Sequence, residues 1–548
     1  MHDLIIRNAL LLDGLGSPPV HGDLAVKEGR LAAIGKADGS ARETLDASGL
    51  ALMPGIIDNH THYDAQITWD PLVSPSPALG VTTAIIGNCG FTIAPCRPAD
   101  RELVMKNLTQ VEGMSLDVLR QGIRWEFETI PQYFDMLERR GTAINIAGFV
   151  GHSSLRTYVM GEDAPRRAAT PDEVARMRAL VIEGMRAGAI GFATSTSPAH
   201  NGHGGLPMPS RLADDAEMRE LAGALKEAGR GVFMLTKGGH TQVAFLEELA
   251  AASGRPVVIA ALLHNSTNPR AVFDDLEAIA AANARGRRLV GAISCCPLSM
   301  DFTLHSPYTF EGLESWQPAL PLKGAAYEAK LKDRGFRDAV RAELQRPAHF
   351  RLFNAQWDQV EVVESANRQA EQHTIGELAR AAGKDPLDFM LDLALGEKLD
   401  TVFNAMLLNS DEAAVGEMLR HPASLVSLSD AGAHLTFFND AGFGLHLLGH
   451  WVRERAALRL EDAVRRLTSV PAQLFGIRGR GVLKPGYAAD LMLFDPAAVG
   501  RGTKQRVFDL PGGHPRLTTP ALGVRGVWVN GVRDLQTLPG RVLREFSA

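Results

Sequence analysis

Eight short apolar runs that alternate with amphipathic helical segments constrain the fold of this chain more than any other feature of its sequence. Each run has the length and composition of a buried strand. The runs cover residues 52–58, 82–87, 143–150, 188–194, 231–236, 256–263, 288–294 and 424–429. The segments between them include expected helices at 172–187, 214–228, 242–253 and 272–285. This alternation predicts an α/β fold in which a parallel sheet closes into a (β/α)8 TIM barrel.

The two ends of the chain follow a different pattern, with short strands and turns in place of long helices. We expect residues 1–52 and 480–548 to pair into one small composite β-sandwich domain, and residues 53–479 to form the barrel. A stretch at about 297–375 interrupts the alternation and contains 352–357 as a candidate strand. A long insertion after the seventh strand would lie over the barrel mouth, so we expect a lid-like segment there.

The composition is that of a soluble globular protein: 45% of the 548 residues are apolar and 22% are charged. A net charge of −6 gives no reason to expect nucleic acid or an anionic membrane as a partner. No apolar run approaches the ~20 residues that cross a bilayer, and the N-terminus has no secretory signal pattern. Four cysteines do not make a disulfide framework, so we expect a cytoplasmic protein. Both a monomer and a homo-oligomer are compatible with the sequence.

Side chains that bind metals or titrate follow the carboxyl ends of at least six of the expected strands, and barrel enzymes carry their chemistry at that edge. His60 and His62 follow the first strand, and their i, i+2 spacing points both imidazoles in one direction. The other strand-end residues are Cys89, His152, Lys237, His264 and Asp430, with His434 four positions later. Imidazole and thiolate are preferred ligands of zinc. The position of these residues at the strand ends therefore predicts a metal site at the barrel mouth.

Each candidate also has a structural interpretation. Cys89 suits a small buried apolar position, and Asp430 suits the cap of a turn. His152 is equally suited to a hydrogen bond within its own loop. His200 and His203 lie in a glycine-rich loop and are expected to be loop residues within reach of a substrate.

Several of these segments resemble a known family. Residues 54–62, PGIIDNHTH, are similar to the opening motif of the metal-dependent amidohydrolase superfamily, and 486–491 and 529–532 resemble its closing β-sandwich segments. Three narrower segments resemble the N-acyl-D-amino-acid deacylase (D-aminoacylase-like) branch: 87–90, 151–156 and 429–434. The resemblance covers essentially the whole chain outside the 297–375 insertion.

The resemblance implies a (β/α)8 barrel, a composite β-sandwich and one or two Zn²⁺ ions at the barrel mouth. Carried over by position, His60 and His62 would bind one metal ion. Cys89 would bridge to or join a second ion, and Asp430 would serve as ligand and proton shuttle.

The chain departs from this branch at two expected ligands. The branch carries a histidine at the end of strand five and another at the end of strand six, but the matching positions here are Lys237 and Ala261. Three interpretations stay open. Lys237 could be carboxylated and supply a carbamate oxygen. His240 and His264 could reach the site from displaced positions. One metal could be held by the first-strand histidines and Asp430, with Cys89 free.

The favoured hypothesis is metal-assisted hydrolysis of the amide bond of an N-acyl (D-)amino acid or a similar small N-acyl compound. Asp430 would act as base and then acid, and His152 would contact the developing oxyanion. Arg156 could bind a substrate carboxylate, and His434 is a further candidate for substrate contact. One alternative is a cyclic-amide or other C–N hydrolase on the same scaffold. Another is a non-catalytic homologue that binds a ligand and has a degraded metal site.

Overall fold

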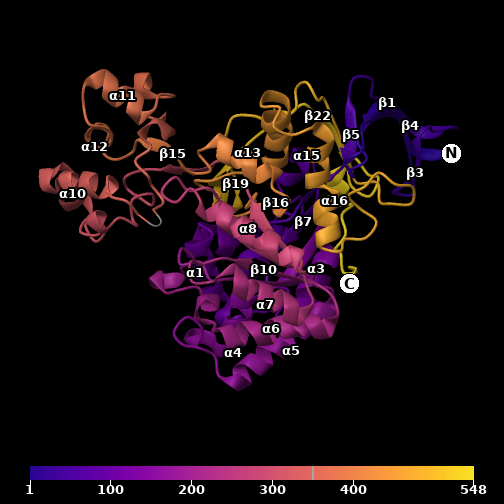
Figure 1. The fold of residues 1–548 in the computed structure, drawn as a ribbon, viewed down its shortest axis with the longest axis horizontal. Helices are drawn as coiled ribbons and strands as arrows, with labels where there is room; N and C mark the ends of the chain where they lie inside the picture. Colours follow the sequence, from indigo (N-terminus) through magenta and orange to yellow (C-terminus); the bar gives the residue numbers. More distant parts are fainter. Residues whose placement is uncertain (349–350, 548) are drawn as a thin grey trace. The chain divides into compact units, whose positions relative to one another are not determined.

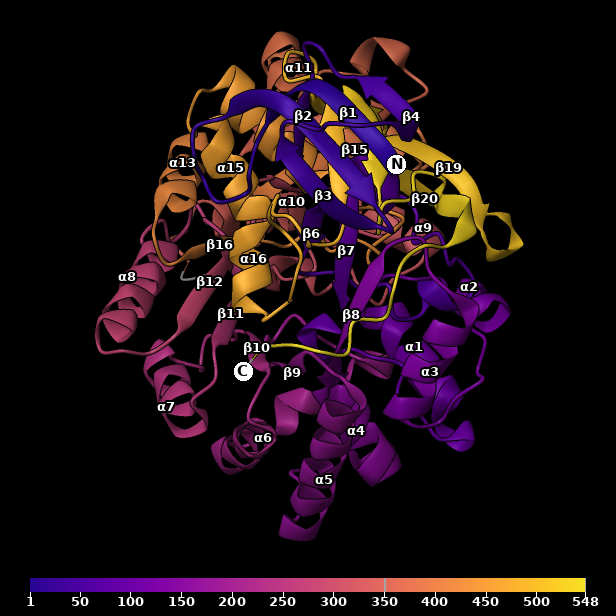
Figure 2. The same cartoon turned by 90° about the vertical axis from the view of Figure 1, so that its right-hand side faces the viewer.

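The computed structural model describes residues 1–348 and 351–547. It confirms the predicted fold class, a (β/α)8 barrel with a separate small sheet domain built from both ends of the chain (Figures 1 and 2). The barrel strands run in the spatial order β16, β12, β11, β10, β9, β8, β7, β6, and every neighbouring pair is parallel. Their bounds are β6 Ile56–Asp58, β7 Val81–Ile86, β8 Asn145–Gly151, β9 Gly191–Ser195, β10 Val232–Thr236, β11 Val257–Leu262, β12 Leu289–Ile293 and β16 Ser424–Val426.

Contacts between the first and last strands close the barrel and bring two distant parts of the sequence together. The Asn59 side chain donates a hydrogen bond to the Val426 carbonyl at 2.9 Å. Beyond the strand ends, Thr61 and Ala431 form a parallel bridge, and the backbone N–H of His62 donates to the Ala431 carbonyl at 2.8 Å. The histidine pair therefore lies beside the segment that follows β16.

The strands are buried on both faces because helices cover the outside of the barrel, as in parallel sheets generally. In Figure 2, helices α4 to α7 lie outside strands β8 to β10. The helices of the barrel are α1 Arg101–Val111, α2 Leu116–Gly122, α3 Ile130–Arg140, α4 His152–Met160, α5 Pro171–Ala187, α6 Asp215–Ala228, α7 Val243–Ser253, α8 Ala271–Ala284, α14 Phe443–His446, α15 Leu460–Leu467 and α16 Ser469–Leu474. No helix in the described part of the chain is long and apolar enough to cross a membrane.

Helix α5 illustrates how local sequence sets these boundaries. The Thr170 hydroxyl accepts the backbone N–H of Glu173 at 3.3 Å, and the Glu173 carboxylate accepts the N–H of Thr170 at 2.8 Å. This reciprocal pair is a capping box, which satisfies two N–H groups that the first turn leaves unpaired. The helix ends at Gly188, whose φ of +106° favours glycine.

The sheet domain is completed by strands from the C-terminal part of the chain. Its order is β22-β17-β5-β1-β2-β3, with β4 paired to β1, so β17 lies between β5 and β22. Leu4, Leu24, Leu491 and Trp528 are buried in one apolar core between these strands. The bounds are β1 His2–Leu11, β2 Val20–Lys27, β3 Arg30–Gly35, β4 Ala41–Asp46, β5 Ala51–Pro54, β17 Leu491–Phe494 and β22 Val524–Trp528. Two short antiparallel pairs also lie in the C-terminal part of the chain: β18 Gly500–Arg501 with β21 Ala521–Leu522, and β19 Gln505–Leu510 with β20 His514–Thr518.

The run predicted as one strand at 52–58 is two strands in different sheets. Strand β5 belongs to the sheet domain and β6 to the barrel. Gly55 lies between them, and a Cβ atom there would lie 2.1 Å from the Thr82 side chain. A glycine is needed because the chain passes this close to β7 where it changes sheet.

A second compact unit consists of Leu263–Asp274 and Cys296–Met418. It contains an antiparallel sheet in the order β13-β15-β14, helices α9 to α12 and most of helix α13, Glu412–Arg420. The bounds are β13 Leu298–Phe302, β14 Val360–Glu364, β15 Val402–Leu408, α9 Gly324–Lys332, α10 Arg334–Leu344, α11 Ile375–Ala382 and α12 Pro386–Gly396. The strand predicted at 352–357 is wrong: Phe353 packs edge-on against Phe310 and Trp357, and the strand begins at Val360. The lid role of the insertion stays a prediction.

Candidate metal centre

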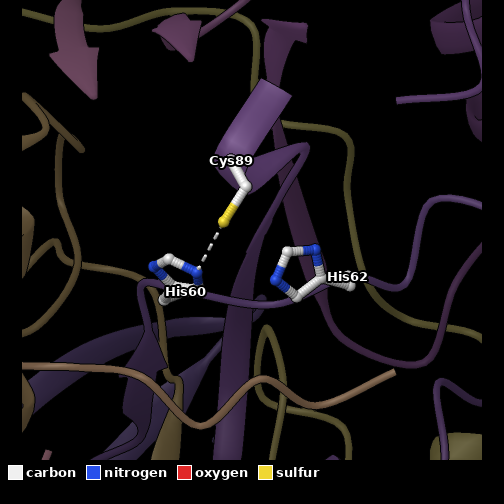
Figure 3. A group of neighbouring side chains, drawn as sticks. All are labelled: His60, His62 and Cys89. Atoms are coloured by element: carbon white, nitrogen blue, oxygen red, sulfur yellow. Dashed lines mark hydrogen bonds between the residues drawn. The ribbon is translucent and has the colours of Figure 1, made fainter. Parts of the chain in front are cut away.

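His60, His62 and Cys89 come together at the carboxyl ends of β6 and β7. One ligand atom from each lies within 4.8 Å of the other two, and all three side chains are buried. Figure 3 shows the thiol directed at the His60 ring, with Cys89 Sγ 3.5 Å from His60 Nε2 and the His62 ring beside them. Two imidazoles and a thiol in this arrangement are a donor set that suits zinc.

A tight turn after β7 presents the thiol. Cys89 has a φ of +57° and stands between Gly87 at +84° and Gly90 at +79°. A Cβ atom on Gly90 would lie 2.6 Å from the carbonyl oxygen of Ala193 on β9, so this turn requires a glycine. The Thr236 hydroxyl at the end of β10 donates a hydrogen bond to Cys89 Sγ at 3.1 Å. The turn is thus fixed by two neighbouring strands.

Asp430 joins this group from the segment after β16. Its Oδ1 atom lies 3.3 Å from His60 Nε2 and 3.7 Å from His62 Nε2. Burial would raise the pKa of this carboxyl, but the hydrogen bond from His62 and the charges of both histidines hold it well below its usual range. The side chain is 24% exposed, whereas the two imidazoles are 3% and 5% exposed. Asp430 is therefore the ionised member of the group that reaches furthest toward solvent.

Glu112, which follows helix α1, is a fifth member that the sequence did not reveal. Its Oε1 atom lies 3.1 Å from Nδ1 of His62, although the two groups are not aligned as in a good hydrogen bond. Burial lowers the pKa of His62, but Glu112, Asp430 and Cys89 together raise it well above its usual value. By contrast, burial lowers the pKa of His60 to about 4. A lone glutamate at a helix end matches no sequence motif. Only its burial, which the sequence does not show, marks it as a candidate for function.

These residues line one cavity of about 70 Å³. Its walls are formed by His60, His62, Cys89, Phe91, Val111, Glu112, His200, Thr236, Ala261, Leu428, Asp430 and His434. Positive φ values occur at Cys89, Leu428, Asp430 and His434, at +57°, +64°, +47° and +54°. Such conformations cost about 1–3 kcal/mol each in non-glycine residues and tend to cluster at functional sites. The wall is therefore strained where its polar residues are presented.

Lys237 and His240 do not line the cavity. Successive strand residues point in opposite directions, and Thr236 faces Cys89, so the Lys237 side chain points away and pairs with Asp275 at 2.8 Å. His240 is exposed. His264 belongs to the second compact unit, where its backbone N–H donates to the Asn409 side chain at 2.7 Å. The geometry does not support metal ligation by Lys237, and ligation by His264 stays a prediction.

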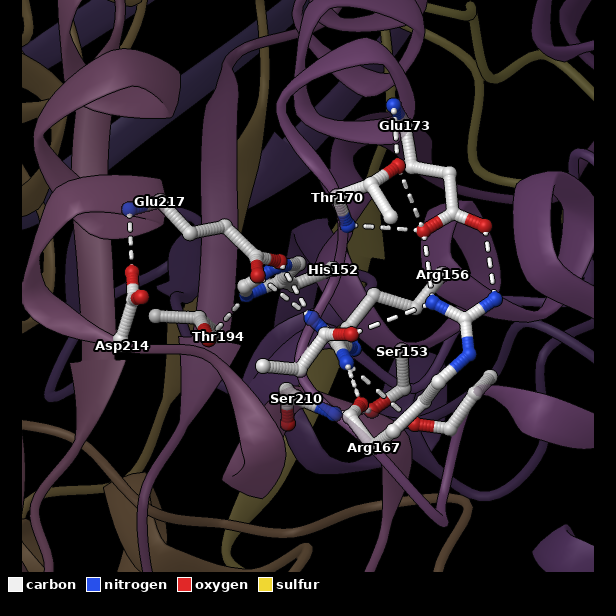
Figure 4. Close-up of polar contacts among 12 residues, drawn as sticks. His152, Ser153, Arg156, Arg167, Thr170, Glu173, Thr194, Ser210, Asp214 and Glu217 are labelled. Carbon is white, nitrogen blue, oxygen red and sulfur yellow. Dashed lines mark hydrogen bonds and ion pairs between the residues drawn. The ribbon is translucent and has the colours of Figure 1, made fainter.

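His152 and Arg156 belong to a separate buried cluster around Glu217 (Figure 4). The two ring nitrogens of His152 contact the Thr194 hydroxyl at 2.8 Å and Glu217 Oε1 at 2.7 Å. Arg156 donates to the same carboxylate at 2.7 Å, and His152, Arg156 and Glu217 are at most 2% exposed. These contacts favour a structural role and do not support the predicted oxyanion contact of His152 or the substrate contact of Arg156. His434 does line the cavity, as a substrate-contacting residue must.

A closed parallel barrel with histidines, a thiol and a carboxylate gathered at its strand ends defines a metal-dependent hydrolase of the TIM-barrel class. The sequence matches the model of the Amidohydrolase family over residues 43–533, and the chain belongs to that family. It is 30% identical to a D-aminoacylase of Alcaligenes xylosoxydans xylosoxydans over 559 residues, which cover 100% of this chain and 98% of that protein.

Two solved structures show the same relationship. A D-aminoacylase structure described by its binuclear metal centre is 25% identical, with a TM-score of 0.68 and full coverage of both chains. An N-acyl-D-glutamate deacylase from Bordetella bronchiseptica, complexed with zinc and a phosphonate inhibitor, is 26% identical with a TM-score of 0.66, and the match covers 99% of this chain and 100% of that one. The protein is therefore an amidohydrolase of the D-aminoacylase-like branch, a hydrolase that acts on carbon–nitrogen amide bonds.

Proposed function

We propose that this protein removes the acyl group from an N-acyl-D-amino acid or a similar N-acyl compound, with one zinc ion held in the cavity. The observation that carries the proposal is the convergence of His60, His62, Cys89 and Asp430 on one small buried space. The similarity to a D-aminoacylase over the full length of the chain supports the substrate class.

The residues present fit a single divalent metal ion. Two imidazole nitrogens, a thiol and an ionised carboxylate face each other, and the Nδ1 atom of His434 is buried without a hydrogen-bond partner. At the ends of strands five and six, the cavity is lined by Thr236, which offers a hydroxyl group, and by Ala261, which offers only a methyl group. Because neither position carries a histidine, the lining favours one metal ion over two. A bound zinc ion lowers the pKa of its water to about 7 and polarises a carbonyl group.

Asp430 is the proposed general base and then general acid. Its carboxylate is ionised, reaches the cavity and is held by two histidines, so it can accept a proton from water and deliver it to the leaving nitrogen. Phe91, Val111 and Leu428 give the same cavity an apolar wall that suits an acyl group and excludes water. His434, on the polar side of the cavity, is the proposed contact for the remaining part of the substrate.

A hydrolysis assay on zinc-loaded protein tests the proposal. The substrates are N-acetyl derivatives of both stereoisomers of several amino acids, with hydantoin and a lactam as cyclic comparisons. We expect free amine to be released from at least one N-acetyl-D-amino acid, to be lost after chelation and to return with zinc. Turnover of the cyclic amides alone would contradict the proposal and favour a cyclic-amide hydrolase.

A further inference from the structure

Glu112 occupies a position that disfavours a carboxylate for two independent reasons. It caps the carboxyl end of helix α1, where its N–H donates to the Leu108 carbonyl at 2.8 Å, and unpaired carbonyls give this end of a helix partial negative charge. Its side chain is also only 3% exposed. A buried negative charge at this end of a helix is retained only where something compensates it.

The compensating group is His62. Glu112 Oε1 lies 3.1 Å from His62 Nδ1, so the carboxylate faces the side of the ring away from the other ligands. The opposite nitrogen, Nε2, lies 3.7 Å from Asp430 Oδ1, and the ring is clustered with Cys89. The imidazole is thus held between one carboxylate behind it and the cluster in front of it.

The chain around Glu112 is built to hold this carboxylate in place. The carbonyl oxygen of Glu112 accepts the backbone N–H of His434, which ties the end of α1 to the segment after β16. The next residue, Gly113, has a φ of +61°, and a Cβ atom there would lie 2.7 Å from the Phe437 ring. A glycine therefore lets the chain turn away directly behind Glu112.

We propose that Glu112 is a positioning residue for the ligand His62: it accepts the Nδ1 proton and so leaves Nε2 as the atom that faces the metal. Ligand histidines commonly donate their second N–H to a carboxylate, which fixes the tautomer and strengthens the ligand. The inference rests on the proposed metal-dependent function, but it concerns metal affinity and not the substrate.

The test compares Glu112→Gln and Glu112→Ala with Glu102→Gln, an exposed glutamate on the same helix. Zn²⁺ affinity is measured by competition with a chelator, and the visible spectrum of the Co²⁺-substituted protein reports the thiolate ligand. We expect Glu112→Ala to weaken Zn²⁺ binding about 10- to 100-fold. Glu112→Gln, which keeps an acceptor oxygen and the volume, should weaken it less, and both should keep the thiolate band of Cys89. Glu102→Gln should match the wild type.

Unchanged affinity in both Glu112 variants would overturn the inference, and so would an altered ligand-field spectrum that marks Glu112 as a ligand itself. If Glu112→Ala does not fold, the nearly isosteric Glu112→Gln decides between these outcomes. Failure of the wild-type protein to bind Zn²⁺ or Co²⁺ would contradict the proposed function, whereas equal binding by wild type and variants contradicts only the role of Glu112.

Discussion

Asp430 combines three properties that the proposed chemistry needs: an ionised carboxylate, contact with two histidines and partial exposure to the cavity. Asp430→Asn keeps the shape but removes the base, so we expect kcat to fall by about 10²- to 10⁴-fold. Zinc content should fall little, because His60, His62 and Cys89 remain. The measurement is amine release with zinc analysis of the same sample, and Asp400→Asn, an exposed site, is the control. Substantial activity in Asp430→Asn would contradict the role of Asp430 as general base.

Glu217 shows how a buried cluster can sustain the fold without joining the chemistry. Burial would raise the pKa of Glu217, but the hydrogen bond from His152 and the charges of His152 and Arg156 lower it to about 2, from 4.5. The carboxylate therefore stabilises the folded state above about pH 4.5, and this contribution is lost as the pH falls toward 2. The shift corresponds to about 3 kcal/mol.

Glu217→Gln should destabilise the protein at pH 7 by about 3–5 kcal/mol, because it leaves Arg156 buried without a counter-charge. Thermal unfolding of wild type and variant across pH 7 to 3 measures this. The difference in Tm should be largest near pH 7 and should narrow as the pH falls below 4.5. A difference that does not change with pH would show that the ionised carboxylate is not what matters.

The turn after β7 requires a glycine at position 90. Gly90→Ala should destabilise the protein by roughly 1–3 kcal/mol, because the new Cβ would meet the Ala193 carbonyl oxygen at 2.6 Å. Displacement of Cys89 should also weaken zinc binding. Gly223→Ala in helix α6, where a Cβ meets nothing within 4 Å, is the matched control and should be neutral or stabilising by up to about 1 kcal/mol. Urea unfolding measures the stability of the two variants, and zinc titration measures their metal affinity. Equal stability and equal zinc affinity in the two variants would contradict the need for a glycine in this turn.

The elements also show what a sequence can predict. Apolar runs located all eight barrel strands because a strand covered on both faces needs continuous apolar residues. Strand-end position then found His60, His62, Cys89 and Asp430 correctly as neighbours. The same rule also selected Lys237, whose side chain pairs with Asp275, because one step along a strand reverses the direction of a side chain. It also selected His152, which begins a helix and contacts Glu217, and it had no means of finding Glu112 at the end of a helix.

Closure of the barrel assembles the site from distant parts of the whole molecule. Hydrogen bonds from Asn59 and His62 to the segment around β16 bring residues that are about 370 positions apart into one site. The sheet domain likewise joins the two ends of the chain, because β17 pairs with β5 on one side and with β22 on the other. The sequence pattern predicted a closed barrel and a sheet built from both ends of the chain, but only the three-dimensional arrangement reveals which side chains face the cavity.

We propose that one metal ion binds at His60, His62, Cys89 and Asp430. The most direct test is elemental analysis of protein purified without chelator and dialysed against trace zinc. We predict about one zinc per chain in the wild type and in Lys237→Met, whose side chain pairs with Asp275 outside the cavity. The double variant His60→Ala/His62→Ala, with unchanged secondary structure by circular dichroism, should retain almost none. Full zinc content in that double variant, or loss of zinc from Lys237→Met, would contradict the account.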